Sequence, residues 1–379
     1  MIGKNTLRTW VEIDTKALAH NYQMWRRLIG PKRKFMAVIK SNAYGHGLVD
    51  CAKIFSRFGA DWLGVDAIEE AITLRQAGIK KPTLVLGYTC PANFMLAVAN
   101  NVVITISSFE SLNKLVLLDK KLKDKKLNFH LKVNTGMNRQ GFSVAELDKV
   151  IKTVTRFKNI KLTGVYSHLA SPCDKKDKVR TEKQISLFKR TTEILAGAGY
   201  INVIKHFCAT GGTAFFASES TDLVRVGLGL YGFWPDMVAQ KYLAQKAKWF
   251  SLKPALTWKA VISETRLVKK GEAVGYNFTH VFKKDSRLAI CAVGYWHGYG
   301  RVLSNRGYVV IKGKKVPVVG RVCMDMIIVD VSQVSKVRVG DEVIVMGPGV
   351  TAYDFAKLSE TSPYEVITRI NPDIPRLYI

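Results

Sequence analysis

The chain has 379 residues, of which 47% are hydrophobic, and its 58 Lys and Arg against 30 Asp and Glu give a formal net charge of +28. The apolar content is sufficient for a packed core and excludes a disordered polypeptide, and the length indicates one large domain or two ordinary ones. The charge excess first points to a nucleic acid or an anionic surface as a partner.

The N-terminus and the cysteines indicate the compartment. Residues 1–8 lack the apolar stretch and cleavage site of a secretory signal, and no apolar run approaches the roughly 20 residues that a transmembrane helix requires. No two cysteines form a CxxC pair or a metal-ligand spacing; they are Cys51, Cys90, Cys173, Cys208, Cys291 and Cys323. We therefore expect reduced thiols, no metal, no membrane association and a cytoplasmic location.

The first two thirds of the chain alternate short apolar runs with amphipathic segments. The helical pattern is clearest at residues 67–77, which Gly78 ends, and at 144–157. A short helix over 211–218 is expected between the last two strands. Eight strand–helix repeats predict a closed (β/α)8 barrel of the TIM type, and the alternative is a doubly wound open sheet. The strand-like runs are 35–40, 62–66, 83–88, 102–107, 127–134, 162–168, 203–210 and 223–231.

The texture changes after Gly232. Runs rich in Val, Ile, Thr and aromatic residues, separated by Gly turns, occupy 254–268, 287–294, 307–311 and 316–332. The chain is therefore expected to be an α/β protein with a barrel over 1–245 and a mainly β domain over 246–379. A polar, helix-compatible linker lies near 236–248, and residues 1–12 are expected to pair with the β domain.

Lys40 follows the first apolar run directly. In a barrel the catalytic groups lie at the carboxyl ends of the strands, where desolvation and neighbouring cations lower a lysine's pKa and free its amine for Schiff-base chemistry. A single lysine at a strand end more commonly only reaches water. The residues around it, Ala-Val-Ile-Lys-Ser-Asn-Ala-Tyr-Gly-His-Gly at 37–47, change that interpretation.

This string resembles the signature of the alanine racemase family, enzymes that use pyridoxal 5′-phosphate (PLP) and combine a barrel with a β domain. Further matches follow in order to the last residues of the chain. The resemblance implies that Lys40 holds PLP covalently and then moves a proton on one face of the cofactor, which serves as the electron sink.

Racemisation removes a proton on one face and returns it on the other, so a second base is expected. The segment 271–276, Gly-Glu-Ala-Val-Gly-Tyr, resembles the family segment that carries it, which makes Tyr276 the candidate. Its pKa would have to fall from about 10, as nearby cations can achieve. In the family this tyrosine comes from the partner subunit, so the resemblance implies a homodimer with shared active sites.

A second matching segment is Lys-Val-Asn-Thr-Gly-Met-Asn-Arg-Gln-Gly at 132–141. Arg139 resembles the arginine that binds the substrate carboxylate, to which a planar guanidinium is suited. Lys132 matches a lysine that is often carbamylated and then holds this arginine as an anion. Asn134 replaces an aspartate common in the motif, with little expected consequence.

The remaining matches concern the cofactor. Arg225 resembles the arginine that faces the pyridine nitrogen and, being always protonated, keeps that nitrogen unprotonated. His206 lies one position from a histidine that often supports this arginine. The family commonly has Asn-Ser where this chain has Thr210 and Gly211. The implied contacts are His168 on the pyridine ring and, at the phosphate, Tyr44, Thr210, Gly211, Leu228 and Tyr364.

The β domain carries the expected substrate entrance. The resemblance implies that Met324 gives a backbone N–H to the substrate carboxylate, that Asp325 holds the local turn and that Tyr295 narrows the entrance, with Arg301 and Arg321 further out. The family reads Gly-Tyr-Ala-Asp-Gly where this chain reads Gly-Tyr-Trp-His-Gly at 294–298. Trp296 and His297 therefore bear on entrance shape, pH dependence and substrate range.

The expected function is interconversion of L- and D-alanine, supplying D-alanine for peptidoglycan. The alternatives are a racemase of broader or different specificity, such as serine or lysine, and a decarboxylase of the same fold, which would lack the two bases. A noncatalytic PLP-binding protein would lack the β domain. A basic nucleic-acid-binding protein is disfavoured because no RRM, KH or zinc-finger motif occurs. The charge is instead assigned to surface lysines such as those in 120–126.

Overall fold

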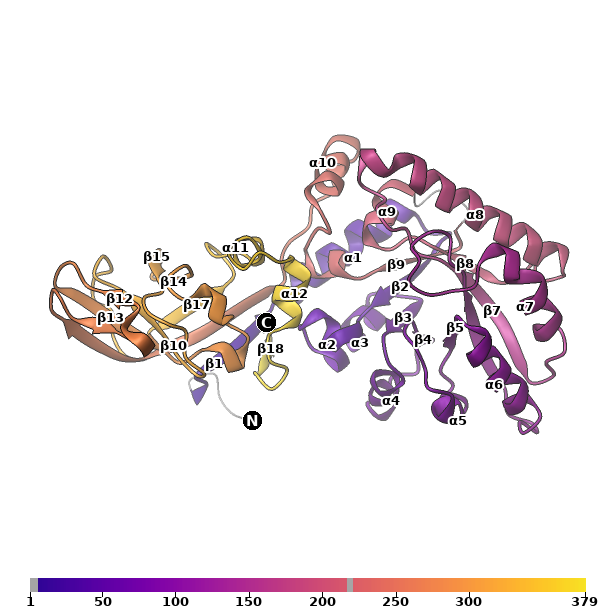
Figure 1. The fold of residues 1–379 in the computed structure, drawn as a ribbon, viewed down its shortest axis with the longest axis horizontal. Coiled ribbons are helices and arrows are strands. Elements are labelled where there is room, and N and C mark those ends of the chain that lie inside the picture. Colours follow the sequence, from indigo (N-terminus) through magenta and orange to yellow (C-terminus); the bar gives the residue numbers. More distant parts are fainter. Residues whose placement is uncertain (1–5, 217–220) are drawn as a thin grey trace. The chain divides into compact units, whose positions relative to one another are not determined.

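The computed structural model describes residues 6–216 and 221–379 (Figure 1), so residues 1–5 and the end of the helix expected over 211–218 lie outside the description. The chain divides into two compact units. The barrel unit comprises Leu18–Ala43 and Leu48–Lys253. The β unit comprises Met1–Ala17, Tyr44–Gly47 and Pro254–Ile379. Residues 44–47 thus belong to the β unit although they follow Lys40 closely in sequence.

Eight parallel strands form the barrel. They pair in the orders β4-β3-β2-β9 and β5-β6-β7-β8. A bridge between Leu84 and Val103 joins the two halves on one side, and Asp222 N–H donates to Lys205 O at 2.8 Å on the other. The ring is therefore closed, which confirms the predicted barrel and excludes the open sheet. The strands are β2 Lys34–Val38, β3 Trp62–Val65, β4 Thr83–Val85, β5 Ile104–Ile106, β6 Leu127–Lys132, β7 Ile160–Tyr166, β8 Ile204–His206 and β9 Leu223–Val226.

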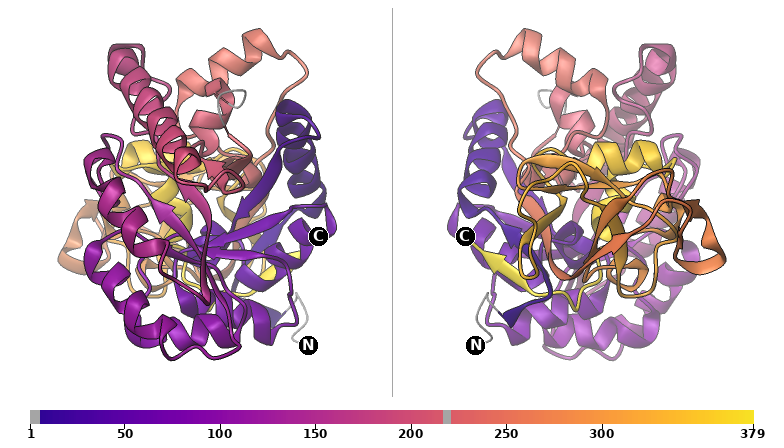
Figure 2. Two further views of the ribbon diagram at one scale, coloured as in Figure 1. Left: turned by 90° about the vertical axis from the view of Figure 1, so that its right-hand side faces the viewer. Right: turned by 90° about the vertical axis from the view of Figure 1, so that its left-hand side faces the viewer.

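Helices surround these strands (Figure 2, left). The segment expected over 67–77 is helix α4, and the one expected over 144–157 begins with a 3-10 turn at Val144–Glu146 and ends earlier than predicted. Each turns apolar positions inward, as the 3.6-residue period requires. The helices are α1 Thr15–Ile29, α3 Leu48–Arg57, α4 Ile68–Gln76, α5 Phe94–Ala99, α6 Phe109–Asp119, α7 Leu147–Val154, α8 Lys178–Gly197, α9 Thr210–Phe216 and α10 Met237–Lys246.

The β unit is built on the long strand β10 (Leu256–Val268). The strand β1 (Thr9–Ile13) runs antiparallel to β10 and parallel to β18 (Arg376–Tyr378). The run expected over 316–332 is not one strand, because a turn divides it into β15 and β16. The other elements are β11 Ala273–Val274, β12 His280–Val281, β13 Ser286–Cys291, β14 Tyr308–Ile311, β15 Lys314–Pro317, β16 Ile327–Asp330, β17 Glu342–Met346, α11 Ala352–Leu358 and α12 Pro363–Thr368.

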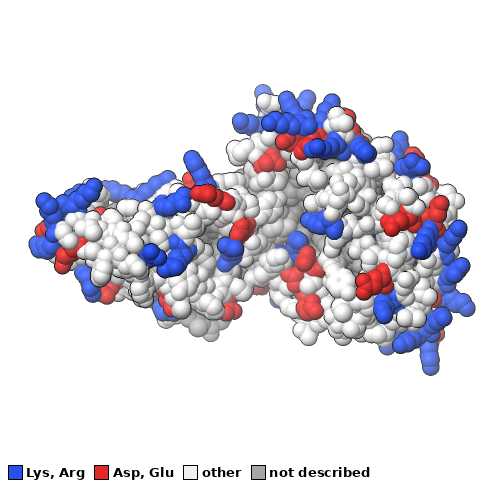
Figure 3. All heavy atoms as spheres, viewed as in Figure 1, with Lys and Arg blue, Asp and Glu red and all other residues white. Residues whose placement is uncertain are grey.

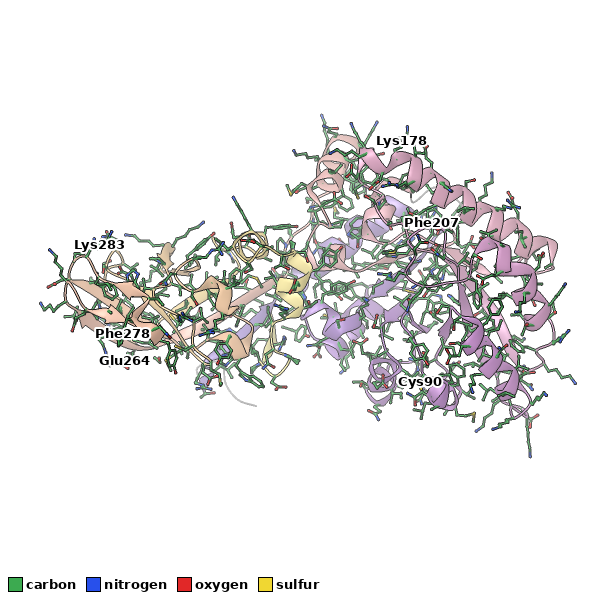
Figure 4. The ribbon with its side chains drawn as sticks, in the orientation of Figure 1. Cys90, Lys178, Phe207, Glu264, Phe278 and Lys283 are labelled. Carbon is green, nitrogen blue, oxygen red and sulfur yellow. The ribbon has the colours of Figure 1, made fainter. Side chains whose placement is uncertain are left out.

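Each unit has its own apolar interior. In the barrel, Phe207 is 1% exposed and lies among the strands in Figure 4, with its ring 5.1 Å from that of Phe188. In the β unit, a cluster joins Val268, Phe282, Leu288 and Val319. Burial of these side chains stabilises each unit through the hydrophobic effect.

The surface carries the charge excess. The side chains of the lysines in 120–126 and 174–183 are exposed, which confirms their assignment to solvated loops and helix faces. On the face shown in Figure 3, basic residues are dispersed among acidic ones over the outer helices. No helix in the described part of the chain is long and apolar enough to cross a membrane. The six cysteines are free thiols, and four are buried: Cys51, Cys173, Cys208 and Cys291.

Candidate active site

The carboxyl ends of the barrel strands bring together most of the cations expected at the site. Lys40 follows β2 by two residues, and its Nζ lies 2.9 Å from Oδ1 of Asp66, the residue directly after β3. The sequence prediction did not include Asp66. Its position at the end of a barrel strand is the signal that identifies it as a candidate.

Lys132 lies at the end of β6 and is only 6% exposed. Its Nζ donates to Oε1 of Gln140 at 2.8 Å. Burial, and then the charges of Arg139, Arg225 and Lys40, lower the pKa of Lys132 to about 8. Lys132 and Arg139 line the same small hollow, which Ser167 and His168 also border. The amine is therefore partly neutral near physiological pH, and it lies in the same hollow as Arg139.

Arg225 is buried at the base of this cluster, 3% exposed. Its Nη1 donates to Nδ1 of His206 at 2.8 Å, and its Nη2 donates to Ser167 O at 2.8 Å and lies 3.3 Å from Nδ1 of His168. Burial lowers the pKa of Arg225 to about 10, so the side chain stays charged at neutral pH. The structure brings His206 and Arg225 together in spite of the one-residue sequence offset.

A second histidine extends this chain of contacts. His206 Nε2 lies 2.8 Å from Nδ1 of His130, which comes from β6. Because arginine can only donate, His206 Nδ1 must accept, so its proton is on Nε2 and is donated to His130. Burial lowers the pKa of His130 and of His168 to about 3 and that of His206 well below its usual value. All three imidazoles are therefore neutral at physiological pH.

Tyr166, at the end of β7, packs against this group. Its ring stacks on His206 with centroids 4.8 Å apart and an interplanar angle of 7°, and the Arg225 guanidinium lies 5.1 Å from the ring centroid. Its hydroxyl donates to Leu86 O at 3.0 Å and lies 2.9 Å from Thr105 Oγ1. Burial raises the pKa of Tyr166 to about 12. Neither Tyr166 nor His130 stands out in the sequence motif that contains it, so neither was expected at the site.

Thr210 and Leu228 lie where two loops meet beyond β8 and β9. Thr210 Oγ1 accepts from Gly227 N–H at 3.2 Å and from Gly229 N–H at 3.5 Å. Within the described residues the Thr210 hydroxyl accepts these two bonds and donates none. Gly211 is tightly surrounded, since a Cβ there would lie 3.0 Å from Cys173 Sγ. The first N–H groups of α9 have no acceptor within the helix, and such groups at a helix N-terminus can bind an anion.

Two of the expected phosphate ligands lie in the β unit. Tyr44 and Tyr364 face each other with ring centroids 6.2 Å apart. Tyr364 lies in α12, whose first turn is capped by the Ser362 hydroxyl, which accepts from Glu365 N–H at 3.3 Å.

The other β-unit candidates are exposed. Tyr276 is 65% exposed, Met324 54% and Tyr295 42%. Asp325 is also exposed, and the turn that contains it is closed by a backbone bond from Cys323 N–H to Met326 O at 3.0 Å. These residues therefore present their side chains at the surface of the unit.

His297 has a local structural role that the sequence comparison did not anticipate. It is 8% exposed, and its Nδ1 accepts from Gly294 N–H at 3.1 Å, which closes the turn Tyr295–His297. Burial lowers the pKa of His297. Trp296, in the same turn, is 59% exposed. A neutral imidazole thus serves as the acceptor at this position.

Comparison with known proteins identifies the family. Residues 13–235 match the alanine racemase N-terminal domain and residues 255–378 the alanine racemase C-terminal domain.

The chain belongs to the alanine racemase family.

Individual members of the alanine racemase family are similar to this chain over nearly its full length. The chain is 36% identical to alanine racemase 2 of Caldanaerobacter subterraneus, covering 98% of this chain and 95% of the relative. It is 35% identical to the alanine racemase of Methanococcus maripaludis, covering 98% of each. The alanine racemase structure from Clostridium difficile gives a TM-score of 0.92 at 32% identity, with 99% of this chain and 96% of that chain covered.

The barrel site fits the cofactor of the alanine racemase family. A structure from Bartonella henselae, with a TM-score of 0.85 at 28% identity and covering 98% of this chain and 100% of that chain, contains covalently bound pyridoxal phosphate. In this chain, Lys40, Lys132, Arg139 and Arg225 lie close enough to influence one another or a common neighbour electrostatically. The positive charges of Lys40, Arg139 and Arg225 suit an anionic phosphate ester and a carboxylate substrate.

Proposed function

We propose that this protein interconverts L- and D-alanine, with Lys40 and Tyr276 as the two bases. The observation that carries the proposal is the position of Lys40 at the end of β2, beside Lys132, Arg139 and Arg225, in a chain that matches the family from end to end. Arg139 would bind the substrate carboxylate and so fix the position of the alanine Cα.

PLP, when bound, supplies a conjugated ring that stabilises negative charge developing at the substrate Cα. The residues that would hold it are Lys40, Arg225 and His168 at the ring, with Tyr44, Thr210, Gly211, Leu228 and Tyr364 as the proposed phosphate ligands. Arg225 stays charged at neutral pH. It can therefore donate a hydrogen bond to a ring nitrogen, but it does not transfer its proton to that nitrogen.

Lys40 would move a proton at the substrate Cα on one face of the site. Asp66, 2.9 Å from Lys40 Nζ, can hold the side chain whenever it is free. A positioned side chain that transfers a proton contributes about 10²- to 10⁴-fold to the rate.

Tyr276 would act on the opposite face from a second copy of the chain. Support comes from the exposure of Tyr276, Phe278 and Met324 on the β unit, at 65%, 72% and 54%. Large apolar side chains at a surface are typical of subunit contacts. The proposal therefore includes a homodimer in which Tyr276, Met324, Asp325 and Tyr295 of each subunit complete the site of the other.

Lys132 is proposed to be carbamylated and to orient Arg139. Its pKa of about 8 leaves a neutral amine able to react with carbon dioxide, and its Nζ lies beside the arginine in the shared hollow. Protein equilibrated with ¹³C-labelled carbon dioxide should show a carbamate carbon signal that is absent from the Lys132→Ala variant.

The proposed cellular role is cytoplasmic supply of D-alanine for peptidoglycan. A broader substrate range is the second candidate, because Trp296 and His297 replace smaller and acidic residues in the turn that carries Tyr295. Rates of racemisation on a panel of L-amino acids that includes alanine, serine and lysine would separate the two. Faster turnover of serine or lysine than of alanine would replace the first assignment.

A further inference from the structure

The backbone that follows Lys40 is left-handed. Ser41, Asn42 and Ala43 have φ of 54°, 55° and 51° with ψ of 56°, 44° and 48°. Residues with a Cβ are strongly disfavoured there, because the Cβ crowds the following carbonyl oxygen, and they occur in it as single residues. Tyr44 continues the run with a φ of 53°, and four such residues in succession require surrounding contacts that hold them. The turn matters because it fixes the direction in which Lys40 leaves the barrel.

One carboxylate contributes to holding this turn, together with the bonds from Ala43 N–H to Ile39 O at 2.8 Å and from Leu48 N–H to Asn42 Oδ1 at 2.9 Å. Glu70 Oε1 accepts from Ser41 N–H at 2.6 Å and from Asn42 N–H at 3.4 Å. Its other oxygen, Oε2, accepts from Asp66 N–H at 2.8 Å and from Ala67 N–H at 3.4 Å. Glu70 therefore joins the loop after β2 to the loop after β3, and these are the loops that carry Lys40 and its ion-pair partner Asp66.

The chemistry of a carboxylate is suited to this position. An ionised Glu only accepts hydrogen bonds and offers two oxygens, whereas an amide would place an NH₂ group against backbone donors. Glu70 is the third residue of α4, where a negative charge also interacts favourably with the helix N-terminus. Glu69, its neighbour on the same helix turn, is exposed, and its carboxylate has no hydrogen bond within the described residues.

We propose that Glu70 is a positioning residue for the reaction: its carboxylate sets the geometry of Lys40 and Asp66 by holding both loops through their backbone N–H groups. This inference rests on the proposed function, in which Lys40 carries PLP and transfers the proton. Glu70 acts through the backbone and not on the substrate. Its loss should therefore affect the chemical step and the environment of the lysine-bound cofactor, and substrate affinity much less.

The test compares Glu70→Gln with Glu69→Gln, which removes the same charge one residue away. Both variants and the wild type are purified with PLP, and three quantities are measured. These are the thermal unfolding midpoint, the pH titration of the visible absorbance band of the lysine-bound cofactor, and kcat and KM for L-alanine. The band reports on Lys40 whether or not the protein racemises alanine.

We expect Glu70→Gln to lower kcat about 10-fold with KM changed less than about two-fold, since small misplacements of a reacting group cost this much or more. The midpoint of the band's pH titration should also shift. Glu69→Gln should match the wild type in all three measurements. A Glu70→Gln protein with wild-type band titration and wild-type kcat overturns the proposal.

Two further variants separate positioning from folding. Ser41→Gly removes the Cβ from the left-handed turn, and glycine adopts this conformation readily. In the Glu70→Gln background it should restore part of the lost kcat and move the band titration back toward wild type. Glu70→Asp, if Glu70→Gln does not fold, keeps the charge with a shorter reach and should show a shifted titration.

Thermal destabilisation alone, with normal band titration and normal kcat per bound cofactor in every Glu70 variant, assigns Glu70 a purely structural role and overturns the inference. A wild-type protein that forms the band but does not racemise alanine contradicts the proposed function only. In that case the comparison of band titrations still decides the role of Glu70.

Discussion

Two candidate residues of the barrel unit are buried, although Arg139 is exposed, whereas the main candidates of the β unit are all exposed. In the barrel, Lys132 is 6% and Arg225 3% exposed, and each has defined hydrogen-bond partners. In the β unit, Tyr276 is 65% and Met324 54% exposed. The barrel therefore organises its part of the site within one chain. The β unit presents residues whose proposed roles depend on a surface from elsewhere, which is the physical basis for proposing shared sites in a dimer.

The sharpest test of the barrel half is removal of its lysine. Lys40→Ala should abolish the visible band of the bound cofactor and reduce racemisation by at least about 10³-fold, because covalent attachment and one proton transfer are both lost. Absorbance spectra and polarimetry measure the two effects. A retained band in this variant would mean that a different lysine holds PLP.

The β-unit half is tested by Tyr276→Phe, which should retain the visible band and lower racemisation by about 10²- to 10³-fold, since only one base is removed. Coexpression with Lys40→Ala then tests whether sites are shared. If they are, each mixed dimer has one intact site, and random pairing restores about a quarter of wild-type activity. No recovery in the mixture would place both bases in a single chain.

A third prediction concerns the pH dependence of stability that a buried histidine of the barrel unit causes. His130 has a folded pKa of about 3, so the unfolded chain, whose histidines have pKa values near 6.5, binds protons first. The contribution of His130 to the free energy of unfolding is therefore fully present above about pH 6.5. It decreases as the pH falls toward 3, by about 1.4 kcal/mol per pH unit for each such histidine. Urea unfolding of wild type and His130→Gln should show a shallower acid slope in the variant. Equal slopes would contradict the buried neutral imidazole.

The smallest expected effect concerns the turn at His297. Its Nδ1 accepts from Gly294 N–H only when neutral. His297→Asp keeps an acceptor and should change stability little, whereas His297→Ala should cost about 1 kcal/mol, as loss of a capping acceptor typically does. Thermal unfolding of both variants measures this. If His297→Ala is as stable as His297→Asp, the capping role is wrong.

Much of the barrel followed from local sequence pattern. All eight strands lie within or beside the predicted apolar runs, and Lys40, Lys132 and Arg225 lie at strand ends because the barrel topology requires it. The β unit was less accessible, since the turn that divides 316–332 lies inside a continuous Val- and Ile-rich run. Strand β17 lies outside the predicted runs and was not anticipated.

The supporting residues were beyond sequence reasoning for a different reason. Glu69 and Glu70 are chemically identical and adjacent, and only the meeting of two loops distinguishes them. The role of His130 depends on the neighbouring strands β7 and β8. They place Gly164 against its ring and His206 within hydrogen-bond distance. Such roles depend on which segments lie side by side, and a linear pattern does not contain that information.

Timed labelling of the thiols can report when each unit unfolds. Cys90 is exposed and would react with a maleimide at once, and Figure 4 shows it near α5. Cys51 and Cys208 are fully buried in the barrel, and Cys291 in the β unit is buried with its pKa raised to about 12. Since only an exposed thiolate reacts rapidly, labelling of these sites must await local or global unfolding. Mass spectrometry of timed labelling would then reveal which unit opens first.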